Sequence, residues 1–205
     1  MIFAIAVIAT STFAQVEDPE TSQLLEFSQA KKALEKYPSF DDIRLTDKQL
    51  LFAKKYVEAH RNYRSYHLLF AIKNTSANVY DSISTEAKLM ILVSTLTEQT
   101  NLNDWGYLDT KNSFDGPPAQ ALLLLGKDAI TALKPLLNDS TRVYLYGSET
   151  GTSSTKYAYR RKDFAFRYVS LLLGDTATFA NDLMQRDNAI DGLIRQLDSK
   201  KEKTK

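Results

Sequence analysis

The chain has 205 residues, and its 26 Lys and Arg side chains balance 25 Asp and Glu to leave a formal net charge of +1. Apolar residues make up 43% of the chain, so the composition excludes a disordered polyelectrolyte and a strongly basic nucleic-acid-binding protein. Cysteine is absent, which excludes disulfides, thiolate zinc sites and cysteine nucleophiles. The two histidines, His60 and His67, lie too far apart along one helix to share a metal ion, and no Gly-rich phosphate loop occurs. We therefore expect no metal and no cofactor.

The first 14 residues are mostly apolar and carry no charged side chain. Their apolar run, Ile2–Ala9, is shorter than the roughly 20 residues that span a bilayer. Thr12 and Ala14 are small residues spaced as at a signal-peptidase site before Gln15. These features predict a signal peptide over residues 1–14 and export to the periplasm or the extracellular space, with a buried N-terminal helix as the alternative. No later stretch is apolar enough to predict a transmembrane segment in the mature chain.

The first half of the mature chain lacks the residues that usually end helices. A helix expected over residues 22–37 stops before Pro38, and no glycine precedes Gly106. Long helices are therefore expected between these two positions. The domain boundaries that we predict are a disordered leader over 15–21, a single helical domain over 22–199 and a disordered tail over 200–205.

Residues 47–73 carry apolar and aromatic side chains at alternating steps of four and three, which is helical spacing. The pattern predicts one long helix, or two helices that break near Asn62. The members of this stripe are Phe52, Tyr56, Ala59, Tyr63, Tyr66 and Phe70. Another helix is expected over 85–97, with its core-facing residues at Leu89, Leu92, Val93 and Leu96.

Residues 101–118 hold many turn-forming residues and the single tryptophan, Trp105, and predict a long structured loop. Segment 121–139, ALLLLGKDAITALKPLLND, then reads as a helix, a turn at Gly126 and a second helix. This segment and RRKDFAFRYVSLLLG at 160–174 resemble a HEAT-like helical repeat, with Thr131 where the family usually has proline. The resemblance covers about one and a half degenerate units over 119–174. It implies packed helical hairpins and a surface that binds partners.

Two segments between these strings alternate with period two, Arg142–Tyr146 and Lys156–Tyr159. They flank the polar stretch 147–155, GSETGTSST. This pattern predicts a Tyr-rich β-hairpin or extended insertion, and a mobile loop between helices is the alternative.

Acidic side chains crowd the 101–118 loop beside Trp105. Two carboxylates next to aromatic rings are the groups that a glycan-cleaving site needs, one as acid and one as base or nucleophile. The same residues are also the ordinary formers of turns, so both interpretations stay open. The carboxylates concerned are Glu98, Asp104, Asp109 and Asp115.

A second candidate group is basic and aromatic and centres on residues 156–168. In an exported protein such a group suits an anionic glycan, a lipid headgroup or an acidic protein better than a nucleic acid. The alternative is that the aromatic rings pack in the core while the cations face water. The candidate binding residues are Trp105, Tyr107, Tyr146, Tyr157, Tyr159, Arg160 and Arg161; no catalytic residue is assigned.

The sequence therefore predicts an all-α fold, a helical bundle or short α–α superhelix with a Tyr-rich hairpin or loop insertion. The leading functional hypothesis is an exported, non-enzymatic binding or scaffolding protein that recognises a protein or an anionic glycan and no nucleic acid. The alternative is a carboxylate-dependent hydrolase that acts on cell-envelope glycans. A stress-type or immunity protein with one partner is a third hypothesis.

Overall fold

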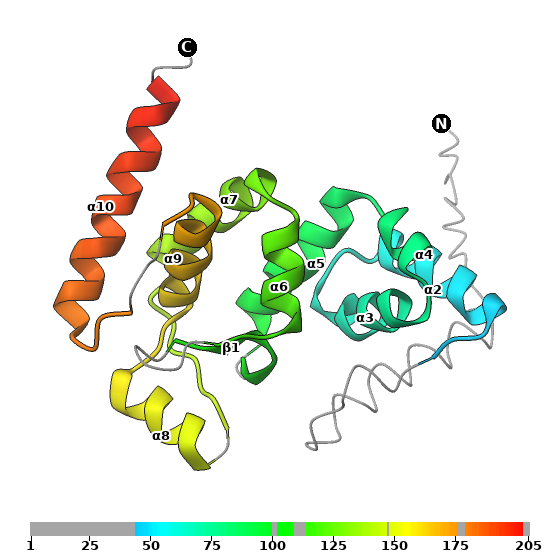
Figure 1. Ribbon diagram of the computed structural model, residues 1–205, viewed down its shortest axis with the longest axis horizontal. Helices are drawn as coiled ribbons and strands as arrows, with labels where there is room; N and C mark the ends of the chain where they lie inside the picture. The colour runs from blue at the N-terminus through cyan, green and yellow to red at the C-terminus, as the bar shows by residue number, and fades with distance from the viewer. Residues whose placement is uncertain (1–43, 100–101, 109–113, 147, 176–178, 203–205) are drawn as a thin grey trace, which may run out of the picture.

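The computed structural model describes residues 44–99, 102–108, 114–146, 148–175 and 179–202 (Figure 1). The predicted signal peptide, the leader and the helix expected over 22–37 lie outside these residues. Across the described part, 73% of the residues are helical and little strand is present, which confirms the all-α class.

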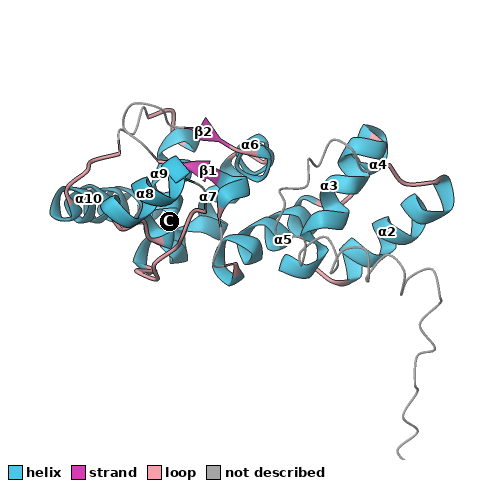
Figure 2. Cartoon of the chain, turned by 90° about the horizontal axis from the view of Figure 1, so that it is seen from below, coloured by secondary structure: helices cyan, strands magenta, loops and turns pink. Residues whose placement is uncertain are grey.

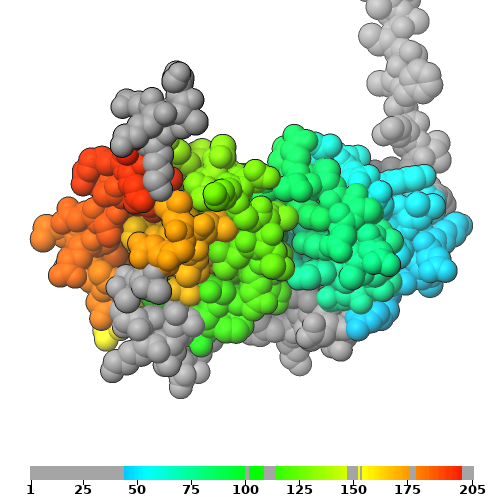
Figure 3. Space-filling model, turned by 45° about the horizontal axis from the view of Figure 1, so that its top comes forward, coloured from blue at the N-terminus to red at the C-terminus, as the bar shows by residue number. Residues whose placement is uncertain are grey.

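Successive elements follow one another along the long axis of the molecule, from α2 at one end to α10 at the other (Figures 1 and 3). Buried apolar side chains form one contiguous cluster that reaches from Leu50 to Leu193. The first half of the chain forms four α-helices and one 3₁₀ helix within the described residues: α2 (Asp47–Ala59), η2 (Tyr63–Ser65), α3 (Tyr66–Thr75), α4 (Ala77–Asp81) and α5 (Thr85–Glu98).

The second half holds the short strands and the remaining helices (Figure 2). The last helix ends at Glu202, so residues 200–202, which we predicted to lie in a disordered tail, are helical. The elements are η3 (Asn103–Trp105), β1 (Gly106–Tyr107), β2 (Phe114–Asp115), α6 (Pro117–Leu124), α7 (Lys127–Leu133), η4 (Lys134–Asn138), α8 (Ser148–Tyr157), α9 (Arg161–Leu172) and α10 (Leu183–Glu202).

The aromatic stripe over 47–73 does not lie on one continuous helix. α2 ends at Ala59, and the chain turns before η2, where the side chain of Asn62 accepts a hydrogen bond from the backbone N–H of Arg64 at 3.0 Å. A side chain that accepts a hydrogen bond from nearby backbone competes with the backbone hydrogen bonds of a helix at this point. The break predicted near Asn62 is thus confirmed. Tyr66 and Phe70 of α3 are fully buried, whereas Phe52 and Tyr56 of α2 are half-buried and Ala59 is exposed.

Near β1 and β2, the backbone at Gly106 and at Gly116 passes too close to a neighbouring carbonyl group to leave room for a side chain. The two strands pair antiparallel, with Gly106 opposite Asp115. A Cβ atom on Gly106 would lie 1.8 Å from the carbonyl oxygen of Phe114, and one on Gly116 would lie 1.8 Å from that of Asp104. Only glycine fits at both positions, so the two glycines fix the tight path of the chain between η3 and α6.

α6 and α7 are joined by the predicted turn at Gly126, which has a φ of +67°, a conformation that glycine adopts without a steric cost. α9 packs against α7 and η4. Helices therefore form within both of the segments that resemble the repeat, 121–139 and 160–174.

The segment 142–162 is not a two-stranded hairpin with a flexible tip. Ser148–Tyr157 form the helix α8, and the flanking segments meet in a single antiparallel bridge between Arg142 and Arg160. The period-two pattern is nevertheless correct for residues 142–146, where Val143 and Leu145 are buried and the residues between them are exposed. The polar stretch contains no proline, and Gly151 lies within α8 without ending it.

Candidate functional site

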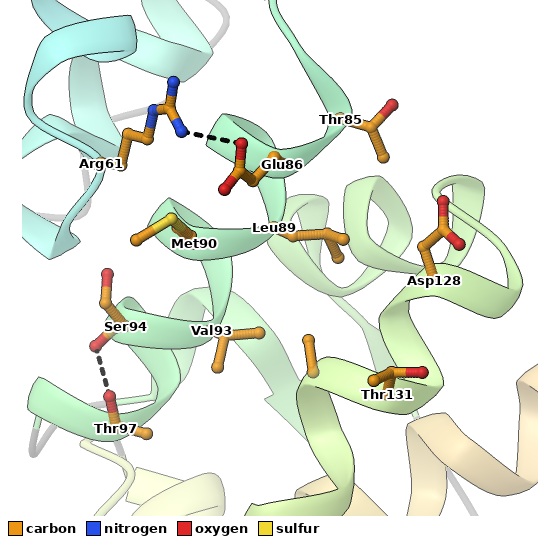
Figure 4. Close-up of a pocket in the computed structure, with 11 residues that line it drawn as sticks. Arg61, Thr85, Glu86, Leu89, Met90, Val93, Ser94, Thr97, Asp128 and Thr131 are labelled. Atoms are coloured by element: carbon orange, nitrogen blue, oxygen red, sulfur yellow. Dashed lines mark hydrogen bonds and ion pairs between the residues drawn. The ribbon is translucent and has the colours of Figure 1, made fainter.

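α5 and α7 pack against each other and leave an open groove of about 650 Å³ (Figure 4). We call it the α5–α7 groove. Its floor is apolar and consists of Leu89, Met90 and Val93 of α5 and Ala132 of α7. Its rim is polar and consists of Arg61, Thr85, Glu86, Ser94, Thr97, Asp128 and Thr131.

The floor of the groove exists because α5 buries one face and leaves the adjoining face partly covered. Ile91, Leu92 and Leu96 have no exposed surface. Leu89 and Val93, one helical turn apart, are only half-buried and extend toward α7 (Figure 4). We expected both residues to face the core together with Leu92 and Leu96; they do pack against the core cluster, and their uncovered surface lines the groove.

One end of the groove carries an excess of negative charge. Glu86 lies in the first turn of α5, and Asp128 lies in the first turn of α7. The guanidinium of Arg61 donates a hydrogen bond to the Glu86 carboxylate at 2.9 Å. Two carboxylates against one guanidinium leave this end negative, and a cation on a ligand would be attracted there.

The opposite end of the groove is neutral. The hydroxyl of Ser94 donates to the carbonyl of Ile91 at 2.9 Å, and the hydroxyl of Thr97 donates to the carbonyl of Ser94 at 3.0 Å. Both hydroxyl donors are therefore used within α5, as is usual for these residues in helices. The groove thus combines an apolar floor with charge at one end only.

Sequence reasoning missed this groove, although one signal for it was present. α5 has more apolar positions than a single core-facing stripe requires, because Leu89, Met90 and Val93 adjoin the buried row. Met90 is 47% exposed. When the apolar surface of a helix is wider than the part that contacts the core, the excess indicates a second packing partner.

Of the predicted binding residues, Trp105 and Tyr159 are fully buried. The ring of Trp105 packs on that of Tyr168, whose hydroxyl donates to the Trp105 carbonyl at 3.1 Å. Tyr159 packs edge-on against Phe164 and Phe179. Neither ring reaches the surface, so both act as core residues.

Tyr157, Arg160 and Arg161 are held by partners within the protein. Tyr157 is half-buried and stacks on Tyr159, with ring centroids 6.2 Å apart. Arg161 donates to the carboxylate of Asp139 at 3.3 Å. Arg160 is buried in an ionic network, so the positive charge that the sequence suggests for a ligand is largely used internally.

Arg160 belongs to a set of five charged residues that we call the Asp163 network. The carboxylate of Asp163 accepts hydrogen bonds from Arg160 at 2.9 and 3.2 Å and from Arg186 at 2.7 Å. Asp187 lies 2.8 Å from Arg160 and 2.7 Å from Lys162. The network ties α9 to α10, and Arg186 also donates to the carbonyl of Tyr157.

The other two predicted binding residues are more accessible. Tyr107 is half-buried and stacks on Phe114, whereas Tyr146 is 58% exposed. The 101–118 loop and the 142–162 segment do meet at this point, because the backbone N–H of Tyr146 donates to the side chain of Asn103 at 2.7 Å. Neither segment lines the α5–α7 groove.

The carboxylates that motivate the hydrolase hypothesis have different surroundings. Asp115 accepts two hydrogen bonds from Arg167, at 2.8 and 2.9 Å. Burial raises the pKa of Asp104 above its usual value, and a hydrogen bond with Tyr66 acts in the opposite direction. Glu98 is exposed at the end of α5, and Asp109 lies outside the described residues. The hydrolase hypothesis therefore stays a prediction.

Comparisons with protein-family models, with curated proteins and with solved structures find no match to this chain. Among the described residues, no helix is both long and apolar enough to cross a membrane. The same part of the chain contains no group of three or more His, Asp or Glu side chains arranged to hold a metal ion.

Proposed function

We propose that this protein is a non-enzymatic binding protein that takes an amphipathic helix of a partner protein into the α5–α7 groove. The observation that carries the proposal is the row of half-exposed apolar side chains between two adjacent helices. Such side chains gain free energy when a partner removes them from water, at about 25 cal/mol per Å² of apolar surface.

The shape and the charge of the groove select the class of partner. Two helices packed side by side form a concave channel into which a third helix fits through apolar residues at helical spacing. The negative end at Glu86 and Asp128 favours a lysine or arginine near one end of that helix. A bound helix of this kind would cover Leu89, Met90 and Val93 together.

Two features of the sequence are consistent with this role. The resemblance to HEAT-like repeats implies helices that present a surface to a partner. The signal-peptide pattern of residues 1–14 supports export, in which case the protein would meet its partner in the periplasm or outside the cell. Both statements are part of the proposal.

The test is a selection of helical peptides from a displayed library on the full mature chain. Enriched peptides should carry apolar residues at i, i+3, i+4 and i+7 and a basic residue near one end. Val93→Asp should weaken their binding at least about tenfold, because a carboxylate then faces the apolar side of the peptide.

The control is Leu124→Asp on α6, where the leucine is 81% exposed and lies outside the groove. This variant should bind the selected peptides as the unchanged protein does. Circular dichroism and thermal unfolding show whether Val93→Asp keeps its fold. The proposal is overturned if no helical peptide is enriched, or if Val93→Asp and Leu124→Asp bind equally well.

A further inference from the structure

The extended segment between η4 and α8 presents three side chains on one face. Tyr144 and Tyr146 are 52% and 58% exposed, and Arg142 is exposed beside them. The residues between them, Val143 and Leu145, are buried at 2% and 4%. Because side chains alternate along extended backbone, the three exposed residues form one row, which we call the Arg142–Tyr146 row.

The backbone of this row is held on one edge by α8 and the residues after it. The N–H of Val143 donates to the carbonyl of Tyr159 at 3.0 Å. The N–H of Leu145 donates to the hydroxyl of Ser154, which is buried, at 3.2 Å.

The other edge of the row is held by the residues before β1. The N–H of Leu102 donates to the carbonyl of Tyr144, and the N–H of Tyr146 donates to the side chain of Asn103. The amide of Asn103 donates in return to the carbonyl of Tyr146. Backbone bonded on both edges is rigid, so the two tyrosines are presented with little loss of freedom on binding.

Both tyrosines expose more than half of their surface to solvent. A rigid pair of tyrosines two residues apart, with their backbone positions about 7 Å apart along the extended segment, is a platform for flat ligands. The electron-rich face of each ring attracts the C–H groups on the face of a pyranose sugar.

Positive charge lies at the Arg142 end of the row. Within the described residues, the ion pairs do not include Arg142, and its partner across the β-bridge is Arg160. The Asp163 network beneath Arg160 contains three cations, Arg160, Lys162 and Arg186, against two carboxylates. With Arg142, the local excess is positive, which favours an anionic ligand.

We propose that the Arg142–Tyr146 row is a binding site for an acidic polysaccharide, separate from the α5–α7 groove. Sugar rings stack on Tyr144 and Tyr146, and a carboxylate of the sugar chain pairs with the guanidinium of Arg142, whose fork suits a carboxylate. The site does not depend on the partner helix proposed above.

Short oligogalacturonate and its fully methyl-esterified form are matched probes, because they share the sugar chain and differ in charge. Binding is measured by isothermal titration calorimetry on the full mature chain. The acidic oligomer should bind more tightly than the ester. Arg142→Gln should remove most of that difference, and Tyr144→Ala or Tyr146→Ala should weaken both oligomers by about tenfold, as expected for the loss of one stacked ring.

Two control variants lie outside the row. Phe114→Ala removes an aromatic side chain that is 49% exposed, and Arg195→Gln removes an exposed cation of α10. Neither should change binding. Thermal unfolding of all variants shows whether each one keeps its fold.

Four outcomes would overturn the proposal. They are the absence of saturable binding, equal binding of acid and ester, equal effects of Phe114→Ala and Tyr146→Ala, and binding of polyglutamate as tight as that of oligogalacturonate. The last result would show an acidic protein as the ligand instead.

Discussion

The carboxylate of Asp163 lies 2.7 Å from a guanidinium nitrogen of Arg186, and the two side chains are only 1% and 3% exposed. The pair joins two helices that follow each other in the chain, α9 and α10. Asp163 also accepts from the backbone N–H of Arg160 at 2.9 Å, so one carboxylate caps α9 and fixes α10. A buried ion pair of this kind specifies where α10 docks.

Removing the carboxylate should destabilise the protein strongly. Asp163→Ala leaves two guanidinium groups, those of Arg160 and Arg186, without their shared partner in a buried place. We expect the free energy of unfolding to fall by about 3–5 kcal/mol, measured by urea denaturation. Asp198→Asn, which removes a more exposed pair with Lys134, should cost less than about 1 kcal/mol. Equal effects of the two substitutions would contradict the structural role of Asp163.

Stability should fall in acid because of Asp187. A hydrogen bond from Lys162 lowers the pKa of this carboxyl below its usual value; burial opposes the shift and Arg160 supports it. Because the pKa is lowered in the folded state, the ion pairs of Asp187 stabilise the folded protein at pH values above the usual pKa of about 3.8. This stabilisation is lost as the pH falls through the folded-state pKa. The melting temperature should therefore decrease below about pH 4.

Asp187→Asn should make the acid part of this curve shallower, because the variant has no carboxyl to protonate at this position. Asp191→Asn, which changes an exposed residue of the same helix, should leave the slope as it is. If the melting temperature of Asp187→Asn depends on pH as that of the unchanged protein does from about pH 7 to about pH 3, Asp187 is not the source of the acid sensitivity.

Two glycine substitutions should have opposite signs. Gly116→Ala would place a Cβ 1.8 Å from the carbonyl oxygen of Asp104, so the hairpin must open. We expect a loss of more than about 3 kcal/mol or failure to fold. Gly192→Ala in α10 meets no atom within 4 Å and should stabilise the protein by about 0.5–1 kcal/mol. Thermal and urea unfolding of both variants measure the two values.

Trp105 is the only tryptophan, so its fluorescence reports the state of the core. Because the ring is fully buried, its emission should be blue-shifted and hard to quench with acrylamide in the folded protein. Trp105→Ala should cost about 3–5 kcal/mol. Ready quenching in the native state would instead indicate that the ring is available to a ligand, as the sequence pattern first suggests.

The helical class could be predicted because it depends on local signals. Such signals influence only the few residues around them. Examples are the lack of glycine before Gly106, the break at Asn62 and the turn at Gly126. Tertiary contacts then decide what local signals leave open. The polar stretch within 142–162 becomes α8, although its flanking pattern alone favours a hairpin.

The candidate site was harder to predict because it depends on burial rather than on residue type. Trp105 and Tyr159 look like ligand-binding residues in the sequence, yet the core covers them completely. Leu89 and Val93 look like core residues, yet α7 covers them only in part. A periodic pattern shows which side of a helix is apolar, but not which neighbour arrives to cover it.

The pairing of Asp163 with Arg186 also has a consequence for biosynthesis. During translation, α9 emerges with a carboxylate whose second arginine has not yet been made, and Arg186 follows 23 residues later. The C-terminal half therefore completes its charge balance only once α10 docks on α9. A chain that ends before Arg186 lacks this pair and exposes the surface of α9 that α10 covers, so we expect it to aggregate or be degraded more readily than the whole chain.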